Sequence, residues 1–217
     1  FVLDVSGSMY GFPLDTAKGV MKKLLGDLRK DDYFNVVLFA GASYKMSKKS
    51  LPATQKNIEK ALGIIDSQKG GGGTELMDGL RTAYGIPVAE DEGVSRSVVV
   101  VTDGYVGVEA QAFKFIRNNL SEANLFAFGI GSSVNRALIE GMAKAGMGEP
   151  FVVLNPEEAK KEATTFREYI EAPVLTDIEV KFDGFKATEF LPEEVPDLLA
   201  KRPIVLIGKY DGKAKGK

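Results

Sequence analysis

The sequence contains no cysteine and no histidine. Without cysteine the chain can form no disulfide, no thiolate zinc site and no thiol-based catalytic site. Without histidine it can form neither a Ser-His-Asp nor a Cys-His catalytic arrangement, and it offers no histidine ligand for zinc or iron. These two absences exclude several common hydrolase sites and the nitrogen- and sulfur-ligated metal centres from this chain.

The sequence also lacks a long apolar run. No uninterrupted apolar stretch approaches the ~18 residues that span a bilayer, and the N-terminus has neither the basic start nor the cleavage site of a signal peptide. We therefore expect no membrane insertion by this fragment. Because the chain begins inside an apolar strand and ends in a basic stretch at 213–217, we expect it to be an excised part of a longer protein.

A strong charge of one sign is absent as well. The 28 basic and 30 acidic residues leave a formal net charge of −2, so neither nucleic acid nor an anionic membrane is favoured as the main partner. Near an expected edge strand, five lysines indicate a solvated edge that discourages strand-to-strand aggregation: Lys45, Lys48, Lys49, Lys56 and Lys60. We expect binding to depend on a local site.

The pattern of apolar residues predicts an α/β fold with one large core and an appendage. Strand-like segments alternate with amphipathic helices over residues 1–172, which predicts a doubly wound, mostly parallel sheet with helices on both faces (Rossmann-like). Expected strands are the opening segment, 34–39, 44–48, 98–101, 125–128 and one beginning at 151. The run at 98–101 does not alternate, which predicts a parallel strand buried on both faces at the centre of the sheet. Expected helices are 13–28, 54–65 with Thr54 as N-cap, 76–84, 110–120, 135–144 with Asn135 as N-cap, and about 156–172.

After residue 172 the pattern changes. Apolar and polar residues alternate over 174–182, a turn is expected at Asp183 and Gly184, and another strand at 203–210. Two or three strands are too few for an independent β-sandwich. We therefore divide the chain into a domain at 1–172 and a partial β-strand segment of an adjoining β domain at 173–217.

Oxygen-bearing side chains recur where expected strands end. Asp4, Ser6 and Ser8 follow the opening strand, Thr74 follows the glycine run at 70–73, and Asp103 follows the apolar run at 98–101. Three hydroxyls and two carboxylates suit the oxygen coordination that Mg²⁺ prefers. We interpret these five residues as one metal site for Mg²⁺, with Mn²⁺ or Ca²⁺ also possible.

The charges of these ligands indicate what else the site attracts. Because hydroxyls are neutral, the two carboxylates only balance the +2 charge, and an acidic group from outside becomes an attractive sixth ligand. In an open α/β sheet, ligands bind beyond the carboxyl ends of the strands where the strand order reverses. If the strands that carry Asp4 and Asp103 are neighbours, their two loops converge at such a point.

Each piece of the motif also has a simpler interpretation. The Asp-x-Ser-x-Ser stretch can be a capping turn, the glycine run a flexible loop, and Thr102 to Gly104 an ordinary turn after a strand. Their occurrence together and in order favours the metal site. Gly129 and Gly131 lack the third spaced glycine of a dinucleotide fingerprint, and no Walker-type motif is present, so nucleotide-cofactor binding is rejected.

The three pieces together resemble the von Willebrand factor A domain and its metal-ion-dependent adhesion site. This resemblance implies that Ser6, Ser8 and Thr74 are hydroxyl ligands, while Asp4 and Asp103 act directly or through water. It also implies an extracytoplasmic location, at the cell surface, in the periplasm or secreted. The stretch after 172 looks like the segment that follows this domain in inter-alpha-trypsin inhibitor heavy-chain-type proteins.

Three functions are compared. The leading hypothesis is a non-enzymatic, Mg²⁺-dependent protein-binding module of the adhesion type, in which an Asp or Glu of the partner completes the metal coordination. The alternative is a Mg²⁺-dependent phosphoryl-transfer hydrolase, but haloacid-dehalogenase-type phosphatases need a second carboxylate two residues after the first, where this chain has Ser6. The third is a structural domain with a vestigial site that has no metal affinity.

Overall fold

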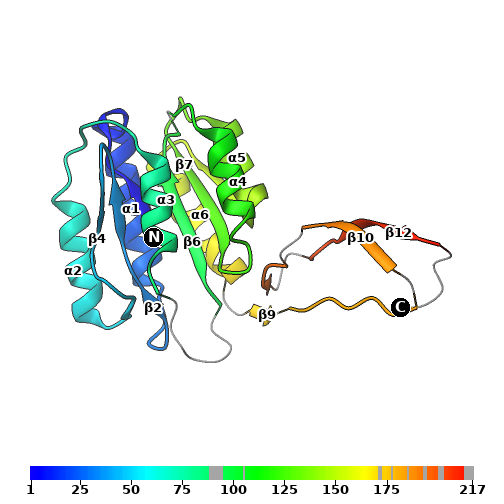
Figure 1. The fold of residues 1–217 in the computed structure, drawn as a ribbon. Coiled ribbons are helices and arrows are strands. Elements are labelled where there is room, and N and C mark those ends of the chain that lie inside the picture. The colour runs from blue at the N-terminus through cyan, green and yellow to red at the C-terminus, as the bar shows by residue number, and fades with distance from the viewer. Residues whose placement is uncertain are drawn as a thin grey trace.

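The chain forms a six-stranded sheet between two layers of helices (Figure 1). The computed structural model describes residues 1–87, 95–104, 106–170, 173–176, 178–184, 186–192, 195–199 and 203–212. In spatial order the strands are β4 (Ser43–Lys45), β3 (Val37–Phe39), β1 (Val2–Asp4), β6 (Ser97–Thr102), β7 (Asn124–Ile130) and β8 (Met147–Val153). Neighbouring strands are parallel except β4, which runs antiparallel to β3. The predicted doubly wound, mostly parallel α/β fold is confirmed.

Apolar side chains on both faces explain the central position of β1, β6 and β7. All seven residues of β7 and the last five of β6 are buried. Successive residues of a strand point to opposite faces. Accordingly Val99 packs with one helix layer and Val100 with the other. The predicted central place of the 98–101 run is confirmed, because β6 lies between β1 and β7.

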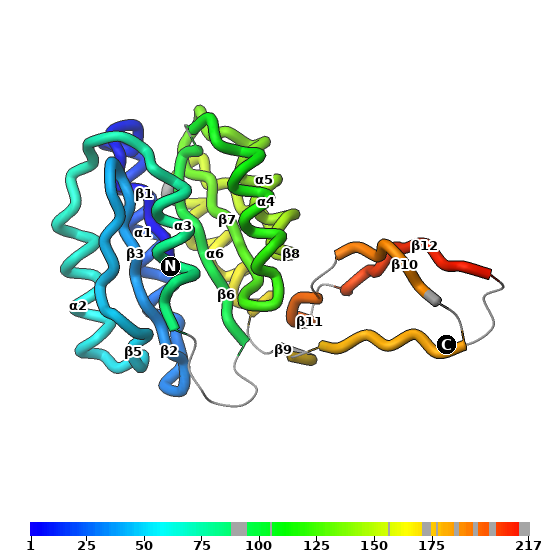
Figure 2. The backbone as a smooth tube through the Cα atoms, viewed as in Figure 1, coloured from blue at the N-terminus to red at the C-terminus, as the bar shows by residue number. Residues whose placement is uncertain are grey.

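Three helices cover each face of the sheet. One core contains residues of α1 (Phe12–Gly26), α2 (Gln55–Asp66) and α6 (Pro156–Ile170). The other contains residues of α3 (Leu76–Tyr84), α4 (Glu109–Arg117) and α5 (Arg136–Ala145). Figure 2 shows α3 and α4 in front of the strands. Both predicted N-caps are confirmed, because the side chain of Thr54 accepts a hydrogen bond from Asn57 N and that of Asn135 from Leu138 N.

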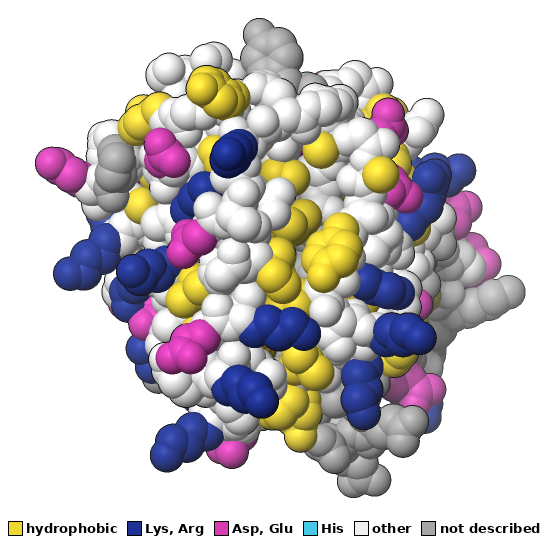
Figure 3. Space-filling view, turned by 90° about the vertical axis from the view of Figure 1, so that its left-hand side faces the viewer, with side chains coloured by type: hydrophobic (Ala, Val, Ile, Leu, Met, Phe, Trp, Pro, Cys, Tyr) yellow, Lys and Arg dark blue, Asp and Glu magenta, His cyan; other side chains and the backbone are white. Residues whose placement is uncertain are grey.

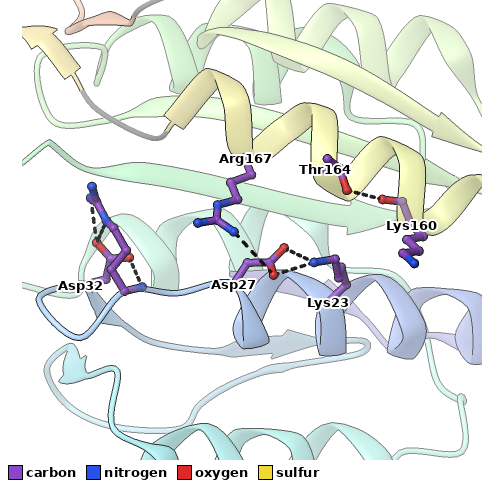
Figure 4. A network of polar contacts seen from close by, with 7 residues as sticks. Lys23, Asp27, Asp32, Lys160, Thr164 and Arg167 are labelled. Carbon is purple, nitrogen blue, oxygen red and sulfur yellow. Dashed lines mark hydrogen bonds and ion pairs between the residues drawn. The ribbon is translucent and has the colours of Figure 1, made fainter.

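On the first face, α1 and α6 lie side by side and are joined by Asp27. Oδ1 of Asp27 lies 2.6 Å from Nζ of Lys23, four residues earlier in α1, and 4.0 Å from Nη1 of Arg167 in α6 (Figure 4). Buried aromatic rings hold α6 more strongly to the sheet. The ring of Phe166 lies 5.0 Å from that of Phe126 and 5.6 Å from that of Phe128.

The predicted single strand at 34–39 is wrong, because the chain divides it in two. Residues Tyr33–Phe34 form β2, which pairs with β5 (Leu51–Pro52), and β3 begins only at Val37. Asn35 marks the break, since its Oδ1 accepts a hydrogen bond from Val36 N and its Nδ2 donates one to Ser47 O at 2.8 Å. The side chain of Asn35 thus takes the hydrogen bond of Val36 N that a neighbouring strand would otherwise accept.

The edge of the sheet is shorter than predicted. The strand expected at 44–48 is β4, Ser43–Lys45, and it has no second neighbour in the sheet among the described residues. The face that carries β4 and α2 shows an apolar strip with Lys and Arg side chains on both sides of it (Figure 3). This arrangement agrees with a solvated, charged edge.

The C-terminal segment forms two small pairs of strands. Strand β9 (Pro173–Leu175) pairs with β11 (Leu198–Leu199), and β10 (Lys186–Leu191) pairs with β12 (Ile207–Asp211). Among the described residues the predicted strand at 174–182 does not continue beyond Leu175, so the prediction is wrong there. Alternation alone does not form a strand unless a neighbouring strand pairs with it. The strand predicted at 203–210 begins only at 207, and β10 was not predicted.

One residue of this segment belongs to the main core. Leu199 is 3% exposed and packs into the cluster that contains Phe166. The predicted boundary at 172 falls on residues 171–172, which lie outside the described residues. Within the described part of the chain, no helix has both the length and the apolar character needed to cross a membrane.

Candidate metal centre

Two of the three motif segments meet because β1 and β6 are adjacent. They are parallel, with Val2 opposite Val100 and Leu3 opposite Val101. Asp4 at the end of β1 and Asp103 after β6 therefore reach the same edge of the sheet. The chain leaves β1 toward α1 on one face and β6 toward α4 on the other, so this edge is the point where the strand order reverses. The condition under which the two loops converge, adjacency of the two strands, is therefore met.

Asp4 is the last residue of β1 and is fully buried. Its Oδ1 accepts a hydrogen bond from Ser6 N at 2.9 Å, and its Oδ2 accepts one from Thr102 Oγ1 at 2.6 Å. Thr102 Oγ1 in turn accepts a hydrogen bond from Gly104 N at 2.9 Å. Asp4 is thus oriented by the loop that follows its own strand and by the neighbouring strand.

Sequence reasoning did not give Thr102 this role. The residue stands in the Thr-Asp-Gly turn that we singled out, but only Asp103 was expected to act. The signal that could have identified Thr102 is its hydroxyl at the last position of β6. This signal becomes informative once β6 is known to lie beside β1, the strand that carries Asp4. Thr102 is a positioning residue, because it acts on the site through Asp4.

The two serines present their hydroxyls together. Ser6 Oγ and Ser8 Oγ lie 3.2 Å apart, joined across the first turn of a short 3₁₀ helix at Gly7–Met9. Ser6 is buried and Ser8 is exposed. Ser8 and Asp103 line the same pocket, and Asp103 is only 7% exposed. Four of the five predicted residues are therefore brought to one place.

Backbone hydrogen bonds bring the glycine run to the same loop. Gly7 N donates to Gly72 O at 3.0 Å, and Gly71 N donates to Val5 O at 2.9 Å. Gly70 has φ +76°, and a Cβ at this position would lie 3.1 Å from Tyr10 Cα, so only glycine allows this approach. Thr74, partly exposed, follows directly after this run, and its loop is docked against the segment that carries the serines.

Electrostatics favours a cation at this edge. Burial raises the pKa of Asp4 and the nearby charge of Asp103 raises it further, while hydrogen bonds from Ser6 and Thr102 oppose this shift. A buried carboxylate with a second carboxylate nearby is costly unless a positive charge compensates them. A divalent cation supplies that charge.

The donor set fits a hard cation. Carboxylate and hydroxyl oxygens are ligands of Mg²⁺, and Mg²⁺ commonly retains waters in the remaining positions. Among the described residues no group of three or more His, Cys, Asp or Glu side chains could hold a metal. At this site the chain thus offers a cation two carboxylates and the neighbouring hydroxyl groups.

The sequence is similar to those of several known proteins. The sequence model of the von Willebrand factor type A domain matches residues 1–150. A von Willebrand factor A domain-containing protein of Dictyostelium discoideum is 28% identical over 200 residues, which are 91% of this chain and 9% of that protein. Human inter-alpha-trypsin inhibitor heavy chain H3 is 28% identical over 197 residues, which are 84% of this chain and 22% of that protein. The chain thus spans under a quarter of these relatives.

Solved structures share the fold. A von Willebrand factor type A protein from Catenulispora acidiphila has a TM-score of 0.68 at 19% identity, covering 77% of this chain and 41% of that one. Proximal thread matrix protein 1 from the mussel byssus, described with a zinc-occupied metal-ion-dependent adhesion site, has a TM-score of 0.57 at 22% identity. That match covers 76% of this chain and 43% of that one.

Proposed function

The chain belongs to the von Willebrand factor type A domain family, and on this basis we propose that it is a metal-dependent protein-interaction module of the inter-alpha-trypsin inhibitor heavy-chain-like type. The proposed cation is Mg²⁺, with Mn²⁺ or Ca²⁺ as alternatives. The proposed partner is a protein that presents an Asp or Glu to complete the coordination. An extracytoplasmic location is part of the proposal and rests on the family resemblance alone.

The observation that carries the proposal is the convergence of Asp4, Ser6, Ser8 and Asp103 at the point where the strand order reverses. Ser6, Ser8 and Thr74 are the proposed hydroxyl ligands. Asp4, each of whose carboxylate oxygens accepts one hydrogen bond, and Asp103 are the proposed carboxylate ligands, acting directly or through water. A bound Mg²⁺ with neutral hydroxyl ligands stays electrophilic and attracts an acidic oxygen.

The proposal includes no catalysis. Ser6 occupies the position two residues after Asp4, where a phosphatase of the alternative class needs its second carboxylate. Ser6 and Ser8 have each other's hydroxyl as a neighbour, and the chain has no histidine to serve as a base. We therefore expect no Mg²⁺-dependent turnover of a generic aryl phosphate. Turnover that is lost in Asp4→Asn would replace this proposal by the phosphoryl-transfer alternative.

Titration calorimetry with Mg²⁺ and Mn²⁺ tests the site. We expect one bound ion in the wild type, loss of binding in Asp4→Ala and Asp103→Ala, and a milder loss in Thr74→Ala because water can replace one neutral ligand. Asp15→Ala is the matched control, since Asp15 is an exposed acid in the first turn of α1. Equal affinities in the wild type and both site variants would rule out the assignment, and no affinity at all would favour a vestigial site.

A further inference from the structure

Two aromatic side chains stand exposed immediately after the proposed metal ligand Ser8. Tyr10 is 74% exposed and Phe12 is 46% exposed, although Met9 between them and the serines is fully buried. Single exposed apolar residues are ordinary, but Phe12 also lines a pocket together with Ser8 and Asp103. The proposed coordination of the cation uses neither of these two rings.

Both aromatic residues are held by rigid backbone. Phe12 is the first residue of α1 and is followed by Pro13, whose fixed φ suits the start of a helix. The backbone of Tyr10 lies against Gly70, and Tyr10 N donates a 3.2 Å hydrogen bond to Gly7 O. Rings on a rigid backbone lose little conformational entropy when a partner covers them.

Phe12 shares a pocket of about 310 Å³ with two of the proposed metal ligands. Ser8 and Asp103 lie in its wall together with Phe12 and Pro13, and Ser132 and Ser133 after β7 contribute hydroxyl-bearing residues. Asp103 is the one charged residue in this lining, and the proposed cation neutralises it. The rest of the lining is uncharged, and Phe12, Pro13 and Ile130 give the pocket an apolar wall that suits an apolar group.

We propose that this pocket, with Phe12 in its wall, is a subsite that selects the residue next to the coordinating acid of the partner. The occupant is an extended protein segment in which a large apolar side chain stands within two residues of the Asp or Glu. This inference rests on the proposed function, because the acid at the cation is what places the neighbouring side chain. Because Ser8 and Asp103 also line the pocket, the apolar side chain and the coordinating acid of the partner must lie close together, as nearby residues of an extended chain do.

Two capped tripeptides test the subsite: acetyl-Gly-Asp-Leu-amide and acetyl-Gly-Asp-Gly-amide, titrated by NMR into the whole chain at saturating Mg²⁺. We expect the Leu peptide to bind about fivefold more tightly, which corresponds to burial of part of one apolar side chain. It should also shift the ring resonances of Phe12. In Phe12→Ala the ratio of the two affinities should fall to about one, while the Mg²⁺ affinity and the affinity for the Gly peptide stay unchanged.

Tyr33→Ala is the matched control, because Tyr33 is 49% exposed and lies in β2 rather than beside the site. It should retain the preference for the Leu peptide. Equal binding of both peptides to Mg²⁺-loaded wild type overturns the subsite and leaves the proposed function intact. Mg²⁺ binding without binding of either peptide overturns the acidic-ligand proposal and the subsite with it.

Discussion

Thr102 at the end of β6 donates a 2.6 Å hydrogen bond to Oδ2 of Asp4 at the end of β1. The two residues lie 98 positions apart in the sequence and on neighbouring strands. The bond fixes the orientation of a fully buried carboxylate, whose other oxygen is held by Ser6 N. Groups that orient a metal-binding carboxylate influence metal affinity even though they do not touch the ion.

Removal of this donor should therefore weaken metal binding. We expect Thr102→Ala to lower the Mg²⁺ affinity about tenfold, the lower end of the range for such orienting partners. Thr102→Ser keeps the hydroxyl and should stay within about threefold of the wild type. Calorimetry on the three proteins measures the effect. Unchanged affinity in Thr102→Ala would show that Asp4 does not need this bond.

The glycine run offers a test with an internal control. Gly70 and Gly72 have φ of +76° and +84°, whereas Gly71 has open space where a Cβ would lie and no positive φ. A side chain in the left-handed region costs roughly 1–2 kcal/mol, so we expect Gly70→Ala and Gly72→Ala to shift the loop that carries Thr74 and to weaken Mg²⁺ binding severalfold. Gly71→Ala should bind as the wild type does. If all three variants bound Mg²⁺ with the same affinity, the conformation of the glycine run would have no influence on metal binding, contrary to the prediction.

The division of the chain at residue 172 makes a prediction about stability. We expect residues 1–172 to fold alone, but with lower stability than the whole chain, because Leu199 is then missing from the core beside Phe166. In the whole chain, Leu199→Ala should cost about 2 kcal/mol and reproduce most of the loss. Urea unfolding of the two proteins gives the comparison. A truncated chain that does not fold would contradict the division.

Tyr84 makes a prediction about alkaline pH. The residue is buried against Phe115, its hydroxyl has no partner among the described residues, and burial raises its pKa above the ordinary value of 10.0. The protonated phenol therefore contributes stability that is fully present below about pH 10 and is lost as the pH rises through the raised pKa. Tyr84→Phe should lose less stability than the wild type above pH 10.

At pH 7 the same substitution should change stability by less than about 1 kcal/mol, because it removes a hydroxyl without breaking a hydrogen bond. Urea unfolding at both pH values measures this. Tyr44→Phe, at an exposed position on β4, is the control and should follow the wild type at both. Parallel losses in the wild type and Tyr84→Phe would contradict the assignment.

Local patterns predicted the elements that depend on local physics. Helix α3 has the predicted bounds, and the predicted caps Thr54 and Asn135 are confirmed, because capping is a hydrogen bond within three residues. The run at 98–101 predicted a central strand because continuous apolar residues need both faces covered. Where pairing with a distant segment decides the outcome, prediction was wrong: the break at Asn35 depends on Ser47, and the strand expected at 174–182 is limited by the two residues of β11.

The sequence by itself determined the class of the fold and the chemistry available to the site. Alternating strand and helix periods specify a layered α/β core, and a chain without cysteine or histidine can offer a metal little besides oxygen. Only the tertiary structure decided which oxygens come together and what stands around them. Thr102 reaches Asp4, and Phe12 joins Ser8 and Asp103 at one pocket, because β1 lies beside β6. Contacts between distant residues depend on strand order, which no local pattern specifies.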